Sequence, residues 1–553
     1  MNRMKTKPRP AARAGVLLTG VTALGLLLAG CGGGPAVNEA SGDTAVVVMP
    51  SQATQVSWDS GYVNSEDYID LQTLLNGTLV RMDYVESDAD GVISQDISKF
   101  SGYLADSYDV SDDGLTYTFH LAEGVVSQAG NPLTADDVVW SFERKFDENT
   151  AGISAGLLAT AGFTSADQVT KIDDSTVSIT IPRASDGYTL LGSLALPMGI
   201  VYDSTFLKEH ATSDDPYAVT WAGTSYDNYG YGPYEIESLT EGAETVLVAN
   251  EDYVEGPPAI QRLVRRVVPE VGNRLNAVRS GDADVAVALR PSDMASLDGD
   301  TNVFVPDIAT NQRLFITLVV TKAPFDNAQV RQAFAHAVDY QRIIDEVYSG
   351  QAERQYGFLN PDMTGYTDEG LPDWDYDPTA AQALLEEAGV TAPIDVTLTI
   401  SNADPVAADI AVILRDSASD AGFALSIEEL TPAQVSEKQD KQLGEAYIGW
   451  GAPWNLSPPY VLQWVNNPDS TDTGWSNPAF FEALERGYAA GDVTSDAAGL
   501  IWNEAEVIWM QDAPNIPIAG LGPTVAFASD LTGWTWRTDG GVDLSRASFK
   551  DAE

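Results

Sequence analysis

Cysteine and histidine are nearly absent from this chain. Its 553 residues contain one cysteine, Cys31, so no disulfide can form within the chain. A body of this length must therefore be held together by hydrophobic cores, and a hydrophobic content of 44% is enough to build about two or three of them. The three histidines, His120, His210 and His336, lie far apart and not at metal-ligand spacing. We therefore expect no metal site and no cofactor.

Basic residues are also scarce. Thirty lysines and arginines stand against 81 aspartates and glutamates, which gives a formal net charge of −51. Such a surface repels nucleic acids and anionic lipid headgroups, so we expect no nucleic-acid partner. The acids are spread over every segment, which is typical of a well-solvated surface, and the excess alone identifies no cationic ligand.

Long hydrophobic runs are lacking except near the N-terminus. The run from Val16 to Ala29 follows a basic segment and is too short to span a bilayer comfortably, but it suits a cleaved secretory signal. Leu28-Ala29-Gly30-Cys31 is typical of a bacterial lipoprotein signal, in which the Cys31 thiol carries the lipid. We predict a signal peptide over 1–30 and a flexible tether over 31–43. The alternative is an ordinary signal peptide with a chance cysteine.

The remaining chain alternates strand-like and helix-like segments without a fixed repeat, as expected of an α/β body. Residues 44–50 (TAVVVMP) predict a buried strand, and 108–124 predict a β-hairpin that turns at Asp113-Gly114. Three helices are predicted from their caps and apolar spacing, over 134–145, 327–348 and 378–389.

Six segments, taken together and in order, resemble the family 5 extracellular solute-binding proteins, the peptide-, nickel- and oligosaccharide-binding lipoproteins of ABC importers. The resemblance runs along nearly the whole chain after the signal. The segments are 113–144 (DGLTYTFHLAEGV, then NPLTADDVVWSFER), 230–234 (GYGPY), 273–285 (NRLNAVRSGDADV), 324–350 (PFDNAQVRQAFAHAVDYQRIIDEVYSG), 377–389 (DPTAAQALLEEAG) and 449–451 (GWG).

This resemblance implies a two-lobed periplasmic-binding-protein-like fold of class II, cluster C type. A discontinuous first domain would comprise 44–78, 215–300 and 516–553. A small second domain, 79–214, would be inserted into it, and a large third domain, 301–515, would form the second lobe. Ligands of the family lie buried between the lobes. The partners implied are a small-molecule solute and the transmembrane subunits of an ABC permease, with the receptor itself a monomer.

The segment that begins at Gly449-Trp450 departs from the family pattern. In peptide-binding members an aspartate three residues after the tryptophan pairs with the α-amino group of the peptide, and here Pro453 occupies that position. Proline cannot neutralise an ammonium group, which weakens the peptide interpretation. The loop instead offers Trp450, Gly451, Ala452, Pro453, Trp454 and Asn455. Tryptophan faces suit sugar rings, cationic groups or bulky peptide side chains; the alternative is that both tryptophans pack in the core.

Further candidates for the ligand site lie elsewhere in the chain. Tyr231 belongs to the motif NYGYGPY, and Tyr62 and Asn64 follow the first strand. Leu521 and Gly522 fall where the family returns a loop to the cleft. Arg313 is a possible anchor for an anionic group, although it is more often an ordinary ion pair.

Enzymatic alternatives find little support in the sequence. Residues 152–156 (GISAG) match the nucleophile elbow of serine hydrolases around Ser154, but a charged helical segment precedes them where a buried strand is required. Residues 86–96 imitate a calcium loop, yet the twelfth position is Ile97 and not glutamate, so a hairpin turn is favoured.

We therefore expect a non-enzymatic, lipid-anchored receptor of an ABC importer on the extracytoplasmic face of the cell membrane, in the periplasm or at the cell surface. Because peptides are frequent ligands in this family, we expect it to capture peptides or peptide-like solutes. The first alternative is an oligosaccharide receptor, favoured by the missing aspartate and the two tryptophans. The second is a secreted serine hydrolase.

Overall fold

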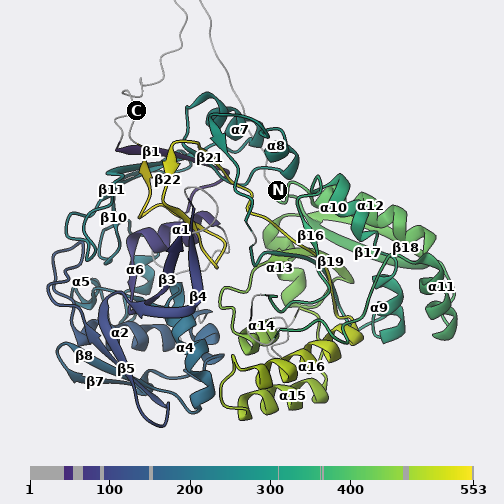
Figure 1. Ribbon diagram of the computed structural model, residues 1–553, viewed down its shortest axis with the longest axis horizontal. Helices are drawn as coiled ribbons and strands as arrows, with labels where there is room; N and C mark the ends of the chain where they lie inside the picture. Colours follow the sequence, from purple (N-terminus) through teal and green to yellow (C-terminus); the bar gives the residue numbers. More distant parts are fainter. Residues whose placement is uncertain are drawn as a thin grey trace, which may run out of the picture. The chain divides into compact units, whose positions relative to one another are not determined.

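The computed structural model describes residues 43–53, 66–86, 92–147, 153–308, 310–361, 363, 366–464 and 472–550. The described residues belong to one compact unit (Figure 1). Within the described part of the chain, no helix is long and apolar enough to cross a membrane. The predicted signal peptide, tether and Cys31 lie outside the described residues, as do Tyr62 and Asn64.

A seven-stranded sheet forms the base of what we call the first lobe, residues 43–304 and 526–550. Its central strand is the predicted apolar one, β1, which pairs in parallel with β12 and β13. The strand order is β10 (Tyr234–Thr240), β11 (Glu244–Ala249), β12 (Arg262–Val267), β1 (Thr44–Met49), β13 (Val285–Ala286), β21 (Ala526–Ala528) and β14 (Val303–Phe304).

Two four-stranded sheets complete this lobe. One has the order β5 (Ala105–Val110), β6 (Thr116–Leu121), β8 (Thr176–Thr180) and β7 (Val169–Asp173); the other has β24 (Val542–Asp543), β23 (Trp534–Trp536), β4 (Val92–Gly102) and β3 (Val80–Glu86). In the second sheet β4, from the predicted domain 79–214, pairs in parallel with β23 of the C-terminal segment. Short pairs join β2 (Gly77–Thr78) to β9 (Ile200–Val201), and β22 (Leu531–Thr532) to β25 (Ser548–Phe549).

Eight α-helices lie among the described residues of the first lobe. They are α1 (Glu66–Leu75), α2 (Ala135–Phe146), α3 (Ile153–Ala159), α4 (Gly187–Leu194), α5 (Ser204–Glu209), α6 (Val219–Ala222), α7 (Val271–Ser280) and α8 (Pro291–Ala295).

The second lobe, residues 313–520, contains one mixed six-stranded sheet. Its order is β16 (Glu353–Arg354), β20 (Asn515–Gly520), β15 (Arg313–Leu318), β19 (Ala446–Gly451), β17 (Ile394–Ser401) and β18 (Phe423–Leu430). The helices of this lobe are α9 (Ala328–Ala335), α10 (Tyr340–Glu346), α11 (Pro378–Glu387), α12 (Ala407–Asp420), α13 (Pro432–Asp440), α14 (Pro458–Trp464), α15 (Pro478–Ala489) and α16 (Asp496–Asp512).

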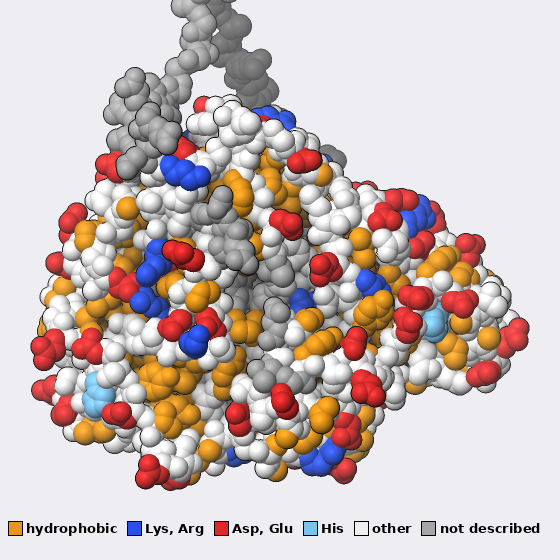
Figure 2. All heavy atoms as spheres, in the orientation of Figure 1, with side chains coloured by type: hydrophobic (Ala, Val, Ile, Leu, Met, Phe, Trp, Pro, Cys, Tyr) orange, Lys and Arg blue, Asp and Glu red, His pale blue; other side chains and the backbone are white. Residues whose placement is uncertain are grey.

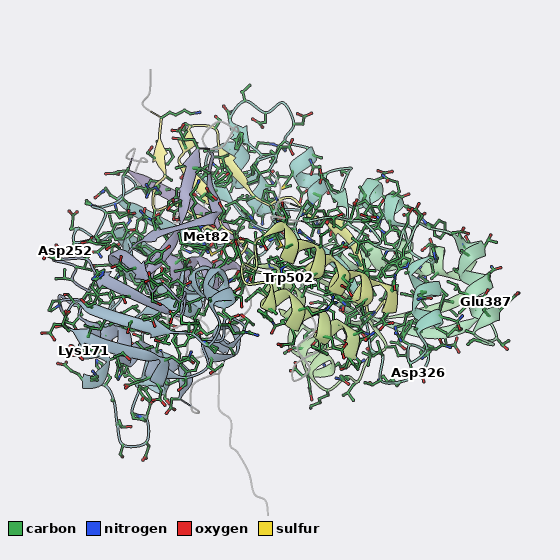
Figure 3. The ribbon with its side chains drawn as sticks, turned by 60° about the horizontal axis from the view of Figure 1, so that its bottom comes forward. Met82, Lys171, Asp252, Asp326, Glu387 and Trp502 are labelled. Carbon is green, nitrogen blue, oxygen red and sulfur yellow. The ribbon has the colours of Figure 1, made fainter. Side chains whose placement is uncertain are left out.

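Each lobe has its own large hydrophobic core. The core of the first lobe joins the seven-stranded and both four-stranded sheets, and includes Met82 and Trp534. The core of the second lobe gathers around the six-stranded sheet and includes the fully buried Trp502 and Trp509 of α16. Figure 3 shows Met82 in the first lobe and Trp502 and Glu387 in the second. A smaller third cluster, which includes Val48 and Ala286, packs beside the seven-stranded sheet. The two large cores, one in each lobe, confirm the predicted two-lobed α/β fold.

Most predicted elements are confirmed. The hairpin forms from β5 and β6, and Gly114 takes the positive φ of 71° that its turn requires. Thr134 is the N-cap residue of α2, and the carboxylate of Asp137 accepts its backbone N–H over 2.8 Å. The predicted helix 378–389 is α11, which Asp377 caps. The imitation calcium loop joins β3 and β4, which pair as an antiparallel hairpin; its residues 87–91 are outside the described part.

The prediction of one continuous helix over 327–348 is wrong. The segment forms two helices, α9 and α10, and residues 336–339 separate them. The side chain of Asp339 accepts a hydrogen bond from the backbone N–H of Arg342, so it caps a new helix inside the apolar pattern. The imidazole of His336 lies 3.0 Å from the carbonyl oxygen of Asp375, at the end of α9. Spacing of apolar residues continues across this break, which is why the pattern concealed it.

Candidate functional site

Two segments connect the lobes. The chain leaves the seven-stranded sheet after β14 and enters the six-stranded sheet at β15, and it returns from β20 to β21. The connections 305–312 and 521–525 are bonded to each other: Leu521 N–H donates to the carbonyl of Gln312 over 3.0 Å, and Thr310 Oγ1 donates to the carbonyl of Leu521 over 2.5 Å. Two short connecting segments between two cores can act as a hinge, about which the lobes close around a ligand.

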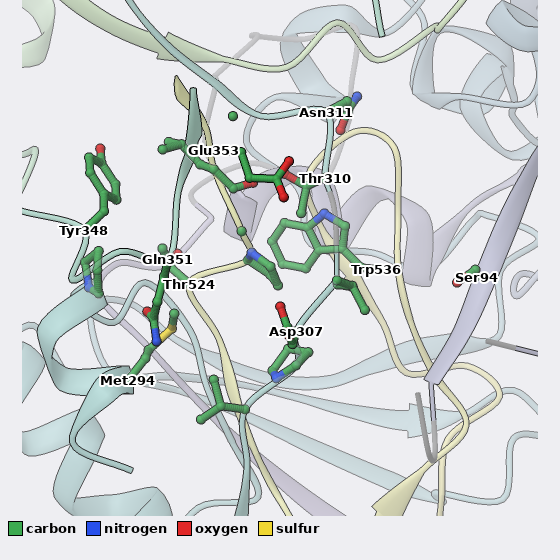
Figure 4. Close-up of a pocket in the computed structure, with 18 of the residues that line it drawn as sticks. Ser94, Met294, Asp307, Thr310, Asn311, Tyr348, Gln351, Glu353, Thr524 and Trp536 are labelled. Carbon is green, nitrogen blue, oxygen red and sulfur yellow. The ribbon is translucent and has the colours of Figure 1, made fainter. Parts of the chain in front are cut away.

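A cavity of about 1180 Å³ adjoins these connections. Both lobes line it, and Figure 4 shows part of the lining. From the first lobe come residues of the start of β4 (93–98), of α8 and the segment after it (291–300), of β14 and of the C-terminal segment 536–538. From the second lobe come Tyr348, part of 350–361, Leu456 and Gly520. The connections contribute part of 305–311 and of 521–524.

Three predicted residues line this cavity, namely Arg313, Leu521 and Gly522. Strand pairing brings their segments together, because Arg313 in β15 lies opposite Gly451 of β19 on one side and Gly520 of β20 on the other. The Arg313 side chain is only 2% exposed and donates to the carbonyl oxygens of Thr310 and Gln312. Three segments that are distant in sequence therefore meet at one end of the six-stranded sheet.

The predicted loop 450–455 lies beside this end of the sheet, but none of its residues lines the cavity. The next residue, Leu456, does line it. Trp450, at the end of β19, is 47% exposed. Pro453 is buried, and its carbonyl accepts a hydrogen bond of 2.6 Å from Asn311 Nδ2. Trp454 is 8% exposed and belongs to the core of the first lobe, although its chain segment belongs to the second.

Asn455 bonds the two lobes to each other. Its Nδ2 donates to the carbonyl of Thr189 over 2.8 Å and to Ser193 Oγ over 3.1 Å, both on α4 of the first lobe. Nearby, the hydroxyl groups of Thr189 and Ser457 are 2.9 Å apart. All four side chains are buried. We call this group the interlobe cluster.

Close packing reinforces the interlobe cluster. A Cβ atom added at Gly192 of α4 would lie 2.8 Å from Asn455 Nδ2, so the loop fits against α4 only because residue 192 is glycine. At a second interlobe contact, the guanidinium of Arg183 lies 3.7 Å from the ring centroid of Tyr488 on α15. The lobes therefore meet in polar and cation–π contacts beyond the two chain connections.

Tyr231 lies in the core of the first lobe with 2% exposure and does not line the cavity. Burial raises the pKa of its phenol well above the ordinary value, with Asp137 and Asp203 adding to the effect. The glycines on either side explain the motif: a Cβ at Gly232 would lie 2.4 Å from the carbonyl carbon of Leu75. The motif NYGYGPY thus permits close backbone packing against the end of α1.

Residues that no sequence motif distinguishes also line the cavity. They include the acids Asp298, Asp307 and Glu353, and Trp536 of β23. Of the two arginines in the lining, Arg537 is held by Asp539 at 3.0 Å and by Asp70 at 3.3 Å. These residues stand outside the motifs, and only the fold brings their segments, 307, 353 and 536, to one cavity.

A deeply buried carboxyl group lies behind the site. Glu506 of α16 is fully buried, and its Oε1 accepts the backbone N–H groups of Phe358 at 2.5 Å and Leu359 at 2.8 Å. Burial raises the pKa of Glu506 to about 7, while the two N–H donors and the charge of Arg313 act in the opposite direction. Glu506 therefore supports the turn that leads into Asn360 and Pro361 of the cavity wall.

The arrangement around Ser154 does not support the serine-hydrolase alternative. Ser154 is 2% exposed in the first turn of α3, and the preceding described element is the helix α2. Gly152 of the elbow pattern falls outside the described residues. In the part of the chain that the structure describes, no group of three or more metal-ligating side chains comes together. Acidic side chains are spread over the face in Figure 2, with fewer basic ones among them.

Comparisons with known proteins agree with this architecture. In sequence, 29% of 441 aligned residues are identical to heme-binding protein A of Haemophilus influenzae, covering 75% of this chain and 78% of that protein. Di/tripeptide-binding protein 2 of Pseudomonas aeruginosa is 26% identical over 472 residues, covering 81% and 86%.

In structure, the chain is similar to the ABC transporter-associated periplasmic binding protein DppA from Helicobacter pylori in complex with the peptide STSA. The TM-score is 0.77 at 21% identity, over 92% of this chain and 98% of that one. The family model for the middle region of the bacterial extracellular solute-binding proteins, family 5, matches residues 99–472, which is more than half of the chain. The chain therefore belongs to family 5 of the bacterial extracellular solute-binding proteins.

Proposed function

We propose that this protein captures peptides or peptide-like solutes between its lobes and delivers them unaltered to the transmembrane subunits of an ABC importer. The observation that carries the proposal is the cavity of about 1180 Å³ that both lobes line beside the two connections. This volume lies just above the range of ordinary ligand pockets, about 300–1,000 Å³, which suits an extended solute of several residues. The relative from Pseudomonas aeruginosa is named for di- and tripeptides, and the solved neighbour holds a tetrapeptide.

Closure supplies the mechanism. A solute that contacts residues of both lobes binds the closed arrangement more tightly than the open one and therefore shifts the population toward it. Excluding water from the cavity strengthens hydrogen bonds to the amides and charges of the solute. The interlobe cluster at Asn455 adds protein–protein contacts to the closed arrangement. The closed surface is then what a permease can distinguish from the empty receptor.

The location follows from the N-terminal sequence. Lipidation at Cys31 after removal of residues 1–30 would tether the receptor to the extracytoplasmic face of the cell membrane through 31–43. The predicted domain boundaries, at 78/79, 214/215, 300/301 and 515/516, remain part of this proposal.

An oligosaccharide receptor is the second candidate. Trp450 is 47% exposed at the end of the six-stranded sheet, and Trp536 lines the cavity. Exposed indole faces suit the apolar faces of sugar rings.

Thermal unfolding with mixed solutes separates the two candidates. A mixture of di- to pentapeptides and a mixture of di- to pentasaccharides are each added to the purified protein. A solute at 100 times its Kd adds about 2.7 kcal/mol to the free energy of unfolding and raises Tm. A rise with peptides only supports the proposal, whereas a rise with saccharides only replaces it by the second candidate. Turnover of either mixture would contradict a receptor that leaves its solute unaltered.

A further inference from the structure

Asn311 bonds both lobes from within the connection 305–312. It lines the cavity and is only 4% exposed. Its Nδ2 donates to the carbonyl oxygen of Pro453 over 2.6 Å and to that of Thr538 over 2.6 Å. Pro453 belongs to the loop of the second lobe, whereas Thr538 follows β23 in the first lobe. A single amide of the connection therefore holds one backbone segment from each lobe.

The orientation of this amide follows from its partners. Both are carbonyl oxygens, which only accept hydrogen bonds, so the NH2 group of Asn311 and not its oxygen must face them. Its two N–H groups suffice for one bond to each lobe. Pro453 and Thr538 are buried, and a buried carbonyl that loses its donor is unfavourable. An amide therefore suits this position, since a carboxylate there would oppose two acceptors.

Both bonds continue into the lobes. The backbone N–H of Thr538 donates to Gln95 Oε1 over 3.0 Å, and Gln95 belongs to β4 of a four-stranded sheet. On the other side, Pro453 stands two residues before Asn455, which bonds α4. The loop of the second lobe is therefore held at two points, by Asn311 beside the connections and by Asn455 at α4.

Neighbouring groups of the connection bond in a different pattern. Thr310 Oγ1 and the backbone carbonyl of Gln312 bond Leu521, which lies in the other connection and not in a lobe. Arg313 donates to the carbonyl oxygens of Thr310 and Gln312. These bonds tie the two connections together but do not fix the direction in which either lobe leaves them. Asn311 acts on that direction, because its two acceptors belong to the lobes themselves.

We propose that Asn311 is the positioning residue of the hinge and sets the angle between the lobes in the solute-bound arrangement. The inference rests on the proposed capture by closure and makes it specific. Atoms close to a hinge move little when the lobes rotate, so short bonds at this place define the final angle. With both bonds formed, the two walls of the cavity face the solute at a fixed separation, and less conformational freedom is lost on binding. Without them the closed lobes occupy a range of angles.

The test measures the separation of the lobes with solute bound. Spin labels on Asp112 of the β5–β6 turn and Glu482 of α15, in a Cys31→Ser background, report the interlobe distance. Asn311→Ala removes both bonds. Asn311→Ser keeps a hydroxyl donor, which can serve one of the two carbonyls at most, and it serves where Asn311→Ala does not fold. The affinity of the same proteins for the mixture of di- to pentapeptides is measured by isothermal titration.

Asn515→Ala is the matched control. Asn515 is buried as well, but its Nδ2 donates to Thr317 Oγ1 over 3.2 Å inside the second lobe, and it does not line the cavity. Because Asn311 lines the cavity, lost affinity alone does not separate a hinge role from a contact with the solute. The width of the distance distribution at saturating peptide does, since a lost contact raises the peptide concentration needed but not the range of angles.

Both Asn311 variants should bind the peptide mixture roughly tenfold more weakly or worse. At saturating peptide their distance distributions should be broader than that of the wild type, most of all in Asn311→Ala. Asn515→Ala should lower Tm and keep the narrow distribution.

Three other results would count against the proposal. Distributions as narrow as the wild type's in the folded Asn311 variants overturn the hinge role of Asn311 and leave capture by closure intact. Peptides that bind the wild type without changing its interlobe distance overturn capture by closure, and the hinge role with it. Absence of any peptide binding by the wild type overturns the peptide function and the inference that rests on it.

Discussion

Asn455, in the loop of the second lobe, donates its Nδ2–H to the carbonyl oxygen of Thr189 on α4 of the first lobe, over 2.8 Å. The two residues are 266 positions apart in the chain. The same amide bonds Ser193 Oγ, and Asn455 Oδ1 accepts the N–H of Ser457. One asparagine side chain therefore uses three hydrogen bonds to fix its own loop and to attach it to the opposite lobe.

Replacing Asn455 should lower the affinity for solute more than it lowers the stability of either lobe. Asn455→Ala removes both bonds to α4 and leaves the Thr189 carbonyl without this donor, which costs the closed arrangement about 1–3 kcal/mol. The affinity for the peptide mixture should fall roughly tenfold or more. Isothermal titration measures the effect, and Ser457→Ala should change affinity in the same direction.

A matched asparagine separates closure from general destabilisation. Asn250 is also buried, but its Nδ2 donates to the carbonyl of Gly232 within the first lobe. Asn250→Ala should lower Tm and leave affinity nearly unchanged. Equal losses of affinity in the Asn250 and Asn455 variants would remove the interlobe cluster from the closure mechanism.

Sequence reasoning selected Asn455 for a different role. An amide beside two tryptophans in a family cleft loop suggested contact with the solute. Its partners on α4 lie in a segment without any distinguishing motif, and only the folded lobes bring them within bonding distance. Local capping and periodicity, by contrast, predicted the β5–β6 hairpin, α2 and α11 well, because these elements depend on neighbours in the sequence.

The cavity residues show the same limit. Arg313, Leu521 and Gly522 were predicted and line the cavity, since their segments stand next to family motifs. Asp307, Glu353 and Trp536 were not, because no motif or spacing distinguishes these two acids among 81 or this tryptophan among 12. Tyr231 was selected for its motif, yet its position follows from the glycines that pack against Leu75.

Trp450→Ala should reduce solute affinity without lowering Tm by more than about 2 °C. The side chain is 47% exposed, so its removal opens no cavity in a core. Trp450 lies opposite Leu314 of β15, and the next residue, Gly451, lies opposite the cavity residue Arg313. Tyr226→Ala serves as the control, because Tyr226 is an exposed aromatic of the first lobe, at 38%. Isothermal titration with the peptide mixture measures the affinity of both variants. Unchanged affinity in Trp450→Ala would exclude this tryptophan from the site.

Glu506 should make the protein less stable as pH rises from about 4.5 to about 7. Its pKa is about 7 in the folded state against 4.5 in the unfolded chain, so the folded state binds more protons in this window and loses free energy of unfolding as pH increases. A shift of this size corresponds to about 3 kcal/mol.

Glu506→Gln isolates that contribution. Glutamine stays neutral and can still accept the N–H bonds of Phe358 and Leu359. Urea unfolding at several pH values should show the variant gaining on the wild type as pH rises to 8, whereas Glu386→Gln should show no such trend. A constant difference between variant and wild type across this range would contradict the raised pKa.

Cys31→Ser should release the protein from membranes. Expressed with its own N-terminus in a bacterial host, the wild-type chain is expected in the membrane fraction, extractable only with detergent, and its mature form should carry the mass of a lipid. The variant is expected in the soluble extracytoplasmic fraction. Fractionation with mass spectrometry measures both properties, and detergent-dependent extraction of Cys31→Ser would contradict the lipid anchor.

Closure around a solute is the central claim, and a distance between the lobes tests it most directly. Because Cys31 is the chain's one cysteine, two spin labels can be placed at will in the Cys31→Ser background, on Asp112 in the β5–β6 turn and on Glu482 of α15. Electron-spin distance measurement without solute and with saturating peptide mixture reports the separation of the lobes. We predict that peptides shift the distribution to shorter distances and narrow it. An identical distribution with and without peptides that bind would contradict capture by closure.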